Sequence, residues 1–156
     1  MPTRISTYKV LVEELETIAL SHLAVKQFQV GQLSDLDVQN NEHPFQRFPV
    51  VFLIPEQSSM DRYGKVTFGF RLLVADIAEN TEDLQKNVHN NTFMIIQDLM
   101  SKIIMTTWGQ LEIEAETPVI IEPFVEKFNN NLAGWSVQLD LVVKSSFDLC
   151  SAAFRQ

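Results

Sequence analysis

The longest regular pattern of hydrophobic positions runs from Asn80 to about Thr107. It opens with Asn80-Thr81-Glu82-Asp83, which is the order of a polar N-cap followed by acids at the positive end of a helix. Such a helix is about 40 Å long, enough to back an entire sheet. We therefore predict a long helix with an apolar face that packs on a sheet. Its predicted core residues are Leu84, Val88, Ile95, Ile96, Leu99, Met100, Ile103 and Ile104.

A shorter helical pattern begins at Ser6 or Thr7 and extends to about Val25. Its acids lie away from the face that carries Leu11, Leu15, Ile18, Ala19 and His22. The residues after it, Lys26–Val30, alternate polar and apolar over a short span and predict a brief strand.

Two segments alternate between apolar and polar positions over most of their length and predict half-buried strands, namely Lys65–Val74 and Trp135–Lys144. The run Phe48–Ile54 is apolar throughout and ends at Pro55, which predicts a buried strand. A short loop joins this run to Lys65–Val74, so we expect an antiparallel hairpin. Pro118–Pro123 is expected to form an extended edge strand, and Phe124–Gly134 a turn or tip.

Together these elements predict an α+β fold, in the order α-β-β-α-β-β. Strands with one apolar and one polar face favour an antiparallel sheet, here with mixed edges, that carries two helices on one face. A length of 156 residues and a hydrophobic content of 46% suit one core. We expect a single domain over residues 1–156, with 145–156 as a candidate C-terminal arm.

Composition excludes several classes of function. The net charge is −8 and the basic residues are scattered, which argues against nucleic-acid binding. No apolar run is long enough to cross a membrane, so we expect no membrane partner. The single cysteine, Cys150, excludes an internal disulfide and fits a reducing compartment.

Candidate metal ligands are sparse. His22, His43 and His89 each lack a second histidine or a cysteine at ligand spacing. Asp35 and Asp37, followed by Glu42 and His43, form the densest cluster, but a Ca²⁺ loop needs further oxygens and a glycine at the bend. The pattern favours a solvated loop over a metal site. A metal-assisted hydrolase built on Asp35, Asp37 and His43 remains the enzymatic alternative.

The acids Glu112, Glu114 and Glu116 alternate along one strand face. Neighbouring acids on such a face lie about 7 Å apart, which is compatible with acid–base chemistry. They lack an accompanying pocket signature, so a solvated or lumen-facing strand is favoured. No nucleophile–base arrangement or phosphate loop is found, and we expect no catalytic residues, no metal and no cofactor.

The loop from Gly31 to Arg47 is long and polar, and such loops in compact domains are typically functional or mobile. In the C-terminal tail, Phe147 and Phe154 suit either a subunit contact or the core of their own domain.

Several stretches resemble small structural proteins of tailed phages. They are Ser34-Asp35-Leu36-Asp37, Phe48-Pro49-Val50-Val51-Phe52-Leu53-Ile54-Pro55, Phe68-Gly69-Phe70-Arg71-Leu72-Leu73-Val74-Ala75-Asp76, Ile121-Glu122-Pro123-Phe124 and Ala133-Gly134-Trp135-Ser136-Val137-Gln138-Leu139. The order of elements is similar to that of tail terminator proteins, which cap the tail tube and join it to the head. The resemblance covers most of residues 5–145 and contains no catalytic signature.

The resemblance implies a virion protein, assembled in the host cytoplasm as a homo-oligomeric ring that is typically a hexamer. Its partners would be the tail tube protein and the head or neck connector proteins, and DNA would pass through without specific binding. An acidic lumen would repel phosphate, and the candidate lining residues are Glu112, Glu114, Glu116 and Asp140. The candidate inter-subunit contacts are Asp35, Asp37, Glu42, Phe45, Asn129, Asn130, Phe147 and Phe154.

Two alternatives to a tail terminator remain open. One is another neck or head-completion ring protein. The other is a non-enzymatic adaptor that captures a partner through the loop at residues 31–47.

Overall fold

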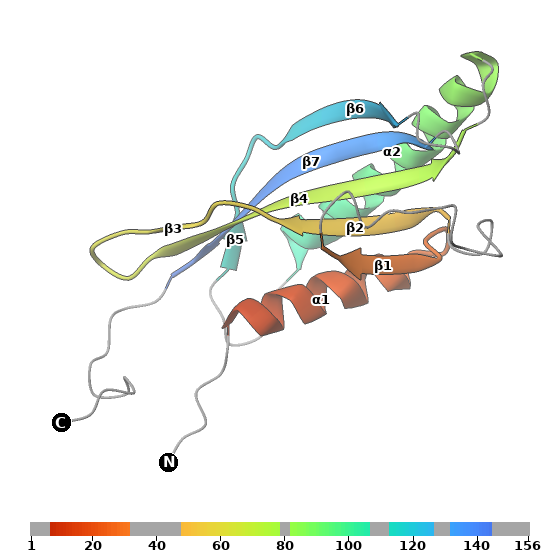
Figure 1. Ribbon diagram of the computed structural model, residues 1–156. Helices are drawn as coiled ribbons and strands as arrows, with labels where there is room; N and C mark the ends of the chain where they lie inside the picture. Colours follow the sequence, from red (N-terminus) through yellow and green to blue (C-terminus); the bar gives the residue numbers. More distant parts are fainter. Residues whose placement is uncertain (1–6, 32–47, 79–81, 107–112, 127–131, 145–156) are drawn as a thin grey trace.

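The computed structural model describes residues 7–31, 48–78, 82–106, 113–126 and 132–144 (Figure 1). This part of the chain has an α+β fold, as predicted. Its helices are α1 (Thr7–Ser21) and α2 (Glu82–Met105). Its strands are β1 (Gln27–Val30), β2 (Val50–Pro55), β3 (Ser59–Met60), β4 (Val66–Ile77), β5 (Ile113–Ala115), β6 (Ile120–Glu126) and β7 (Leu132–Val143). The candidate arm at 145–156 lies outside the described residues.

The strands form one sheet in the order β1-β2-β4-β7-β5, in which β3 also pairs with β4 and β6 with β7. The long strands β4 and β7 pair along their whole length, from Val66 opposite Val143 to Ile77 opposite Leu132. One edge of β4 is paired with β7 along its whole length. The other edge of β4 pairs with β2 over one part and with β3 over the next. In the same way, β5 and β6 share the outer edge of β7.

The predicted hairpin is confirmed, because β2 and β4 pair antiparallel with Leu53 opposite Leu72. The sheet is mixed, since β1 runs parallel to β2. The predicted order was incomplete: it has two strands on each side of α2, whereas the described chain has four before it and three after it.

The two helices contribute to the same hydrophobic core on one face of the sheet, here called the helix face (Figure 1). Alternate residues of β4 and β7, including Leu72 and Leu139, point to this core. From α2 it receives Ile95, Ile96, Leu99, Met100 and Ile103, and from α1 Leu11, Leu15, Ile18 and Ala19. Ile104 was also predicted to be a core residue of α2, and this was wrong, because its side chain is 47% exposed.

A second hydrophobic cluster explains the unbroken apolar run of β2. Val51 and Leu53 belong to the core on the helix face, whereas Val50 and Phe52 belong to a separate cluster of buried residues. Leu73 and Ala75, which pair with Phe52 and Val50, belong to the second cluster too. One end of the sheet is therefore buried on both faces. The sequence pattern predicted that the face opposite the helices would be polar throughout, and this was wrong at that end.

The expectation of a turn over Phe124–Gly134 was wrong at both ends. β6 continues to Glu126 and pairs with β7, which already begins at Leu132. Pro123 does not interrupt β6, because β6 is an edge strand and a proline there need not donate a ladder hydrogen bond.

Gly134 permits close strand packing, since a Cβ at this position would lie 1.8 Å from the carbonyl oxygen of Val74.

The helix ends also differ slightly from the prediction. α1 ends at Ser21 rather than near Val25, because the chain turns at His22, whose N–H bonds the carbonyl oxygen of Ala19.

Ile95 tests the orientation of α2, because its side chain is 4% exposed while that of the adjacent Met94 is 55% exposed. We expect Ile95→Asp to lower the free energy of unfolding by about 4 kcal/mol or more, since it places an unpaired charge in the core. Met94→Asp should change it by less than about 0.5 kcal/mol. Urea denaturation followed by circular dichroism measures both, and equal effects of the two substitutions would show that the helix is oriented differently.

Candidate functional site

The candidate site is the face of the sheet opposite the two helices, where β5 lies beside the end of β7; we call it the open face. Glu114 pairs with Val142, and the N–H of Glu116 donates to the carbonyl oxygen of Asp140 at 2.9 Å. Because residues directly opposite each other in a sheet share a face, Glu114, Glu116 and Asp140 all lie on the open face. The structure thus brings together three of the four acids proposed as a lumen lining. Glu112 lies outside the described residues.

Cations lie among these acids. Lys65 and Lys144 line an open depression of about 360 Å³ together with Glu114 and Glu116. The Nζ of Lys144 lies 3.9 Å from the Oε2 of Glu114, but both side chains are more than half exposed. Such exposed pairs contribute little to stability.

A second cation lies further along the same face. The Nε of Arg71 is 2.9 Å from the Oε1 of Glu56, whose N–H bonds the carbonyl oxygen of Gly69. Arg71 pairs with Gln138, which places it on the same side of the sheet as Asp140. The open face is therefore of mixed charge, and the purely acidic strand face expected from the sequence was too simple.

The signal for these cations was present in the sequence. Lys65 and Arg71 occupy the polar positions of one alternating strand, and Asp140 and Lys144 those of another. Which residues become neighbours depends on the pairing register, and the alternation pattern alone does not contain it.

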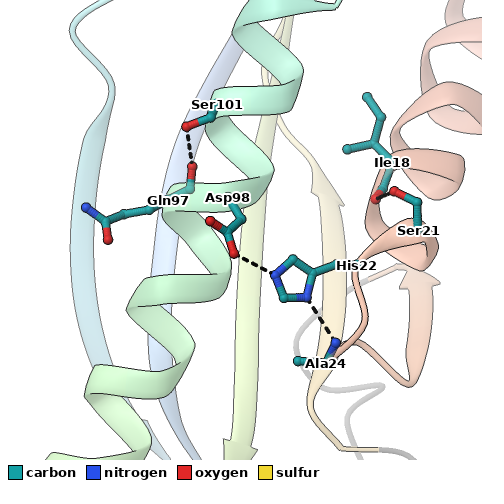
Figure 2. A network of polar contacts seen from close by, with 7 residues as sticks. All are labelled: Ile18, Ser21, His22, Ala24, Gln97, Asp98 and Ser101. Atoms are coloured by element: carbon teal, nitrogen blue, oxygen red, sulfur yellow. Dashed lines mark hydrogen bonds and ion pairs between the residues drawn. The ribbon is translucent and has the colours of Figure 1, made fainter.

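The only close pairing of histidine and carboxylate within the described residues joins the end of α1 to α2 (Figure 2). The Nε2 of His22 lies 2.9 Å from the Oδ2 of Asp98, and the N–H of Ala24 donates to the Nδ1 of His22 at 3.1 Å. Since Nδ1 accepts a hydrogen bond, the neutral ring carries its proton on Nε2 and donates it to Asp98. Both ring nitrogens are engaged within the fold.

Ser21 is next to this pair in the sequence but does not complete a catalytic triad. Its Oγ donates to the carbonyl oxygen of Ile18 at 2.7 Å and accepts from the Nζ of Lys102 at 2.8 Å. A nucleophilic serine requires a base that removes its proton, and no ring nitrogen of His22 contacts this Oγ in Figure 2. These contacts fasten α1 to α2 and carry no evident chemistry.

His89 serves a similar structural purpose at the other end of the sheet. Its Nε2 lies 3.3 Å from the carbonyl oxygen of Phe124, which can only accept, and its own carbonyl accepts the indole N–H of Trp135 at 2.8 Å. Trp135 also makes edge-to-face contacts with the rings of His89 and Phe93. These bonds join α2 to β6 and β7.

Several predicted site residues cannot be placed. The candidate inter-subunit contacts Asp35, Asp37, Glu42, Phe45, Asn129, Asn130, Phe147 and Phe154 lie outside the described residues, as does His43. Within the described ranges, no group of three or more His, Cys, Asp or Glu residues is arranged to hold a metal ion. Neither described helix combines the length and the hydropathy needed to span a bilayer.

No protein-family model matches the chain, and no curated protein sequence matches it.

The pair formed by His22 and Asp98 can be tested as a structural contact. We expect Asp98→Ala to lower the free energy of unfolding by about 0.5–1 kcal/mol, the usual contribution of one hydrogen bond. Gln97→Ala changes the neighbouring exposed residue and should have a smaller effect. Chemical denaturation measures both, and ¹⁵N NMR of the imidazole should show the proton on Nε2. A ring protonated on Nδ1 in the neutral form would contradict this assignment.

Asp76 gives the fold a pH dependence. Burial raises the pKa of this carboxyl above its ordinary value of 3.8, although the N–H of Ile77 and the charge of Lys26 act to lower it. The folded state therefore holds the proton more tightly than the unfolded state, so this residue's contribution to stability falls as the pH rises through 3.8 to the folded-state pKa. An asparagine keeps an oxygen that can accept from Ile77.

We expect the stability of Asp76→Asn, relative to the native protein, to increase over that pH range and then to remain constant. Denaturation curves between acidic and neutral pH provide the measurement. A relative stability that falls with rising pH would contradict the expectation.

Proposed function

We propose that this chain is a virion structural protein of a tailed phage, a tail terminator that forms a ring, caps the tail tube and joins it to the head and neck. The observation that carries the proposal is the layered arrangement of the sheet. Both helices lie on one face, and the opposite face presents charged residues beside β5, the last strand in the order of the described sheet. A ring subunit needs surfaces of this kind, because one must line the channel while others contact neighbours.

The charge of the open face supports passage of DNA without retention. Five acids on or beside this face, with three cations among them, leave it net negative; the acids are Glu56, Glu114, Glu116, Glu122 and Asp140, and the cations Lys65, Arg71 and Lys144. Release of counterions by a basic surface drives binding to DNA, and a surface of net negative charge lacks this driving force. The net charge of −8 for the whole chain acts in the same direction.

A non-enzymatic role is part of the proposal, and the described polar contacts support it. His22 has both ring nitrogens bonded, and His89 bonds a backbone carbonyl. Within the described residues, neither histidine is positioned to activate a nucleophile. The proposed protein uses no metal and no cofactor.

The finer architecture is part of the proposal. The whole chain, residues 1–156, forms one domain, and residues 145–156 act as an arm. Residues 35–47 and 129–131 supply contacts along the tail axis. The same observations suit another neck or head-completion ring, and the identity of the bound partner distinguishes these two assignments.

The state of association tests this proposal. We expect the purified protein to form a closed ring, most simply a hexamer, in mass photometry and in negative-stain images. Added to purified tail tubes, these rings should cap one end of each tube. A monomer at micromolar concentration that also fails to bind tubes would contradict the proposal, and a ring that binds only the head connector would favour the other neck protein.

A further inference from the structure

The turn between β3 and β4 projects past the end of β2 (Figure 1). β2 stops pairing with β4 at Phe70, and β4 continues beyond it to pair with β3 at Thr67 and Val66. We call Met60, at the end of β3, together with Arg62 and Tyr63 in this turn the hairpin tip. They are the residues that a partner would meet first at this end of the sheet.

Hydrogen bonds of Asp61 hold the turn in one conformation. Its Oδ1 accepts the N–H of Tyr63 at 2.8 Å and that of Lys65 at 2.9 Å, while its own N–H bonds the carbonyl oxygen of Lys65 at 3.0 Å. Gly64 has a φ of 88°, a backbone conformation that glycine adopts without strain. The turn is thus preorganised, which reduces the entropy lost on binding.

This turn and the end of β3 expose large side chains to solvent. Met60 is 62% exposed and Tyr63 is 73% exposed. The guanidinium carbon of Arg62 lies 5.6 Å from the centre of the Tyr63 ring, so the two side chains form one surface. Tyrosine, arginine and methionine are enriched where protein interfaces form, and the first two dominate their binding energy.

The tip is also positively charged on an acidic protein. The turn carries two cations, Arg62 and Lys65, and one acid, Asp61, whose Oδ1 already accepts hydrogen bonds from two backbone N–H groups. With the whole chain at −8, the tip is complementary in charge to other surfaces of the same protein.

The outer face of α1 offers a matching surface. Glu16 and Leu20 are both exposed and lie four residues apart on α1, a rise of about 6 Å, and Leu23 in the following turn is fully exposed. The spacing of Glu16 and Leu20 is therefore close to the 5.6 Å between the Arg62 guanidinium and the Tyr63 ring. Glu13, on the same face, is already paired with Lys9 at 3.7 Å, which makes Glu16 the main acid available to Arg62.

We infer that the hairpin tip of one subunit docks on the outer face of α1 of the next, with Arg62 against Glu16 and Tyr63 and Met60 against Leu20 and Leu23. The two surfaces are different, so the contact is head-to-tail and repeats around a closed ring. The inference rests on the proposed ring and specifies the subunit contact that builds it.

Two variants that each remove one side of this contact test it. Arg62→Ala/Tyr63→Ala removes the tip and leaves α1 intact, whereas Glu16→Ala/Leu20→Ala removes the acceptor and leaves the tip intact. Alone, each should be monomeric, or should require at least about tenfold more protein to form the ring. Mixed in equal amounts, they should form dimers and nothing larger, because each mixed pair retains a single intact contact.

Lys86→Ala/Met94→Ala provides a matched control, because it removes one exposed cation and one exposed methionine from α2. It should form the wild-type ring. Mass photometry across a dilution series measures all five samples, and thermal denaturation verifies that each variant is folded. If the tip and acceptor variants still form the wild-type ring, this contact is wrong while the proposed ring stands. A wild-type monomer would overturn the proposed ring and the contact together.

Discussion

The burial of one face of α2 against β4 and β7 is the interaction on which the other elements depend. Ile96 is fully buried there, and each large aliphatic side chain buried in this way contributes about 1.5–3 kcal/mol. Thr92 is the one buried polar residue in the described ranges, and its Oγ1 donates to the carbonyl oxygen of Val88 at 2.6 Å. Among the side chains of α2 that the structure describes, this interface therefore leaves no buried polar atom without a hydrogen bond. Trp135 and His89 add directional bonds at one end, while α1 is fastened to the other side of α2 through Asp98 and Lys102.

Because the helices cover one face of the sheet, the strand register determines which residues reach the opposite face. The helices bury the residues of β4 and β7 that point toward them, so the alternate positions reach the opposite surface. At one end these positions are apolar and form the second cluster around Phe52 and Leu73. At the other end of the sheet, these positions are occupied by Lys65, Asp140 and Lys144. They lie near Glu114 in β5 and Glu116 just after it. The candidate site is thus a consequence of strand register rather than of a local motif.

The long periodic elements could be predicted from the sequence, because burial on one face leaves a regular signature. This holds for α2 and for the strands β4 and β7, whose alternation is clear. β1 could not be assigned a partner, since four residues with a parallel pairing leave no pattern that identifies the neighbouring strand. β6 was cut short at Pro123, because a proline signals a break in sequence but is tolerated at a sheet edge.

The candidate site was predicted only in part. Glu114, Glu116 and Asp140 share a face as expected, while the cations between them became visible only once register placed β4 beside β7. At the position of the hairpin tip, the sequence predicted only a short loop between two strands. The hydrogen bonds of Asp61 hold the exposed Tyr63 and Met60 in a fixed arrangement. These bonds form only in the folded turn, so the sequence pattern does not show them. The candidate contacts in the loop and the C-terminal tail stay predictions.

A cryo-electron microscopy reconstruction of the wild-type protein tests the central claim most directly, namely that this layered fold closes into a ring through unlike surfaces of neighbouring subunits. The account expects a closed ring with each β3–β4 turn seated on the next subunit's α1 and the open face turned toward the channel. A symmetric dimer joined through identical surfaces, or a ring whose channel is lined by the helices, would contradict it.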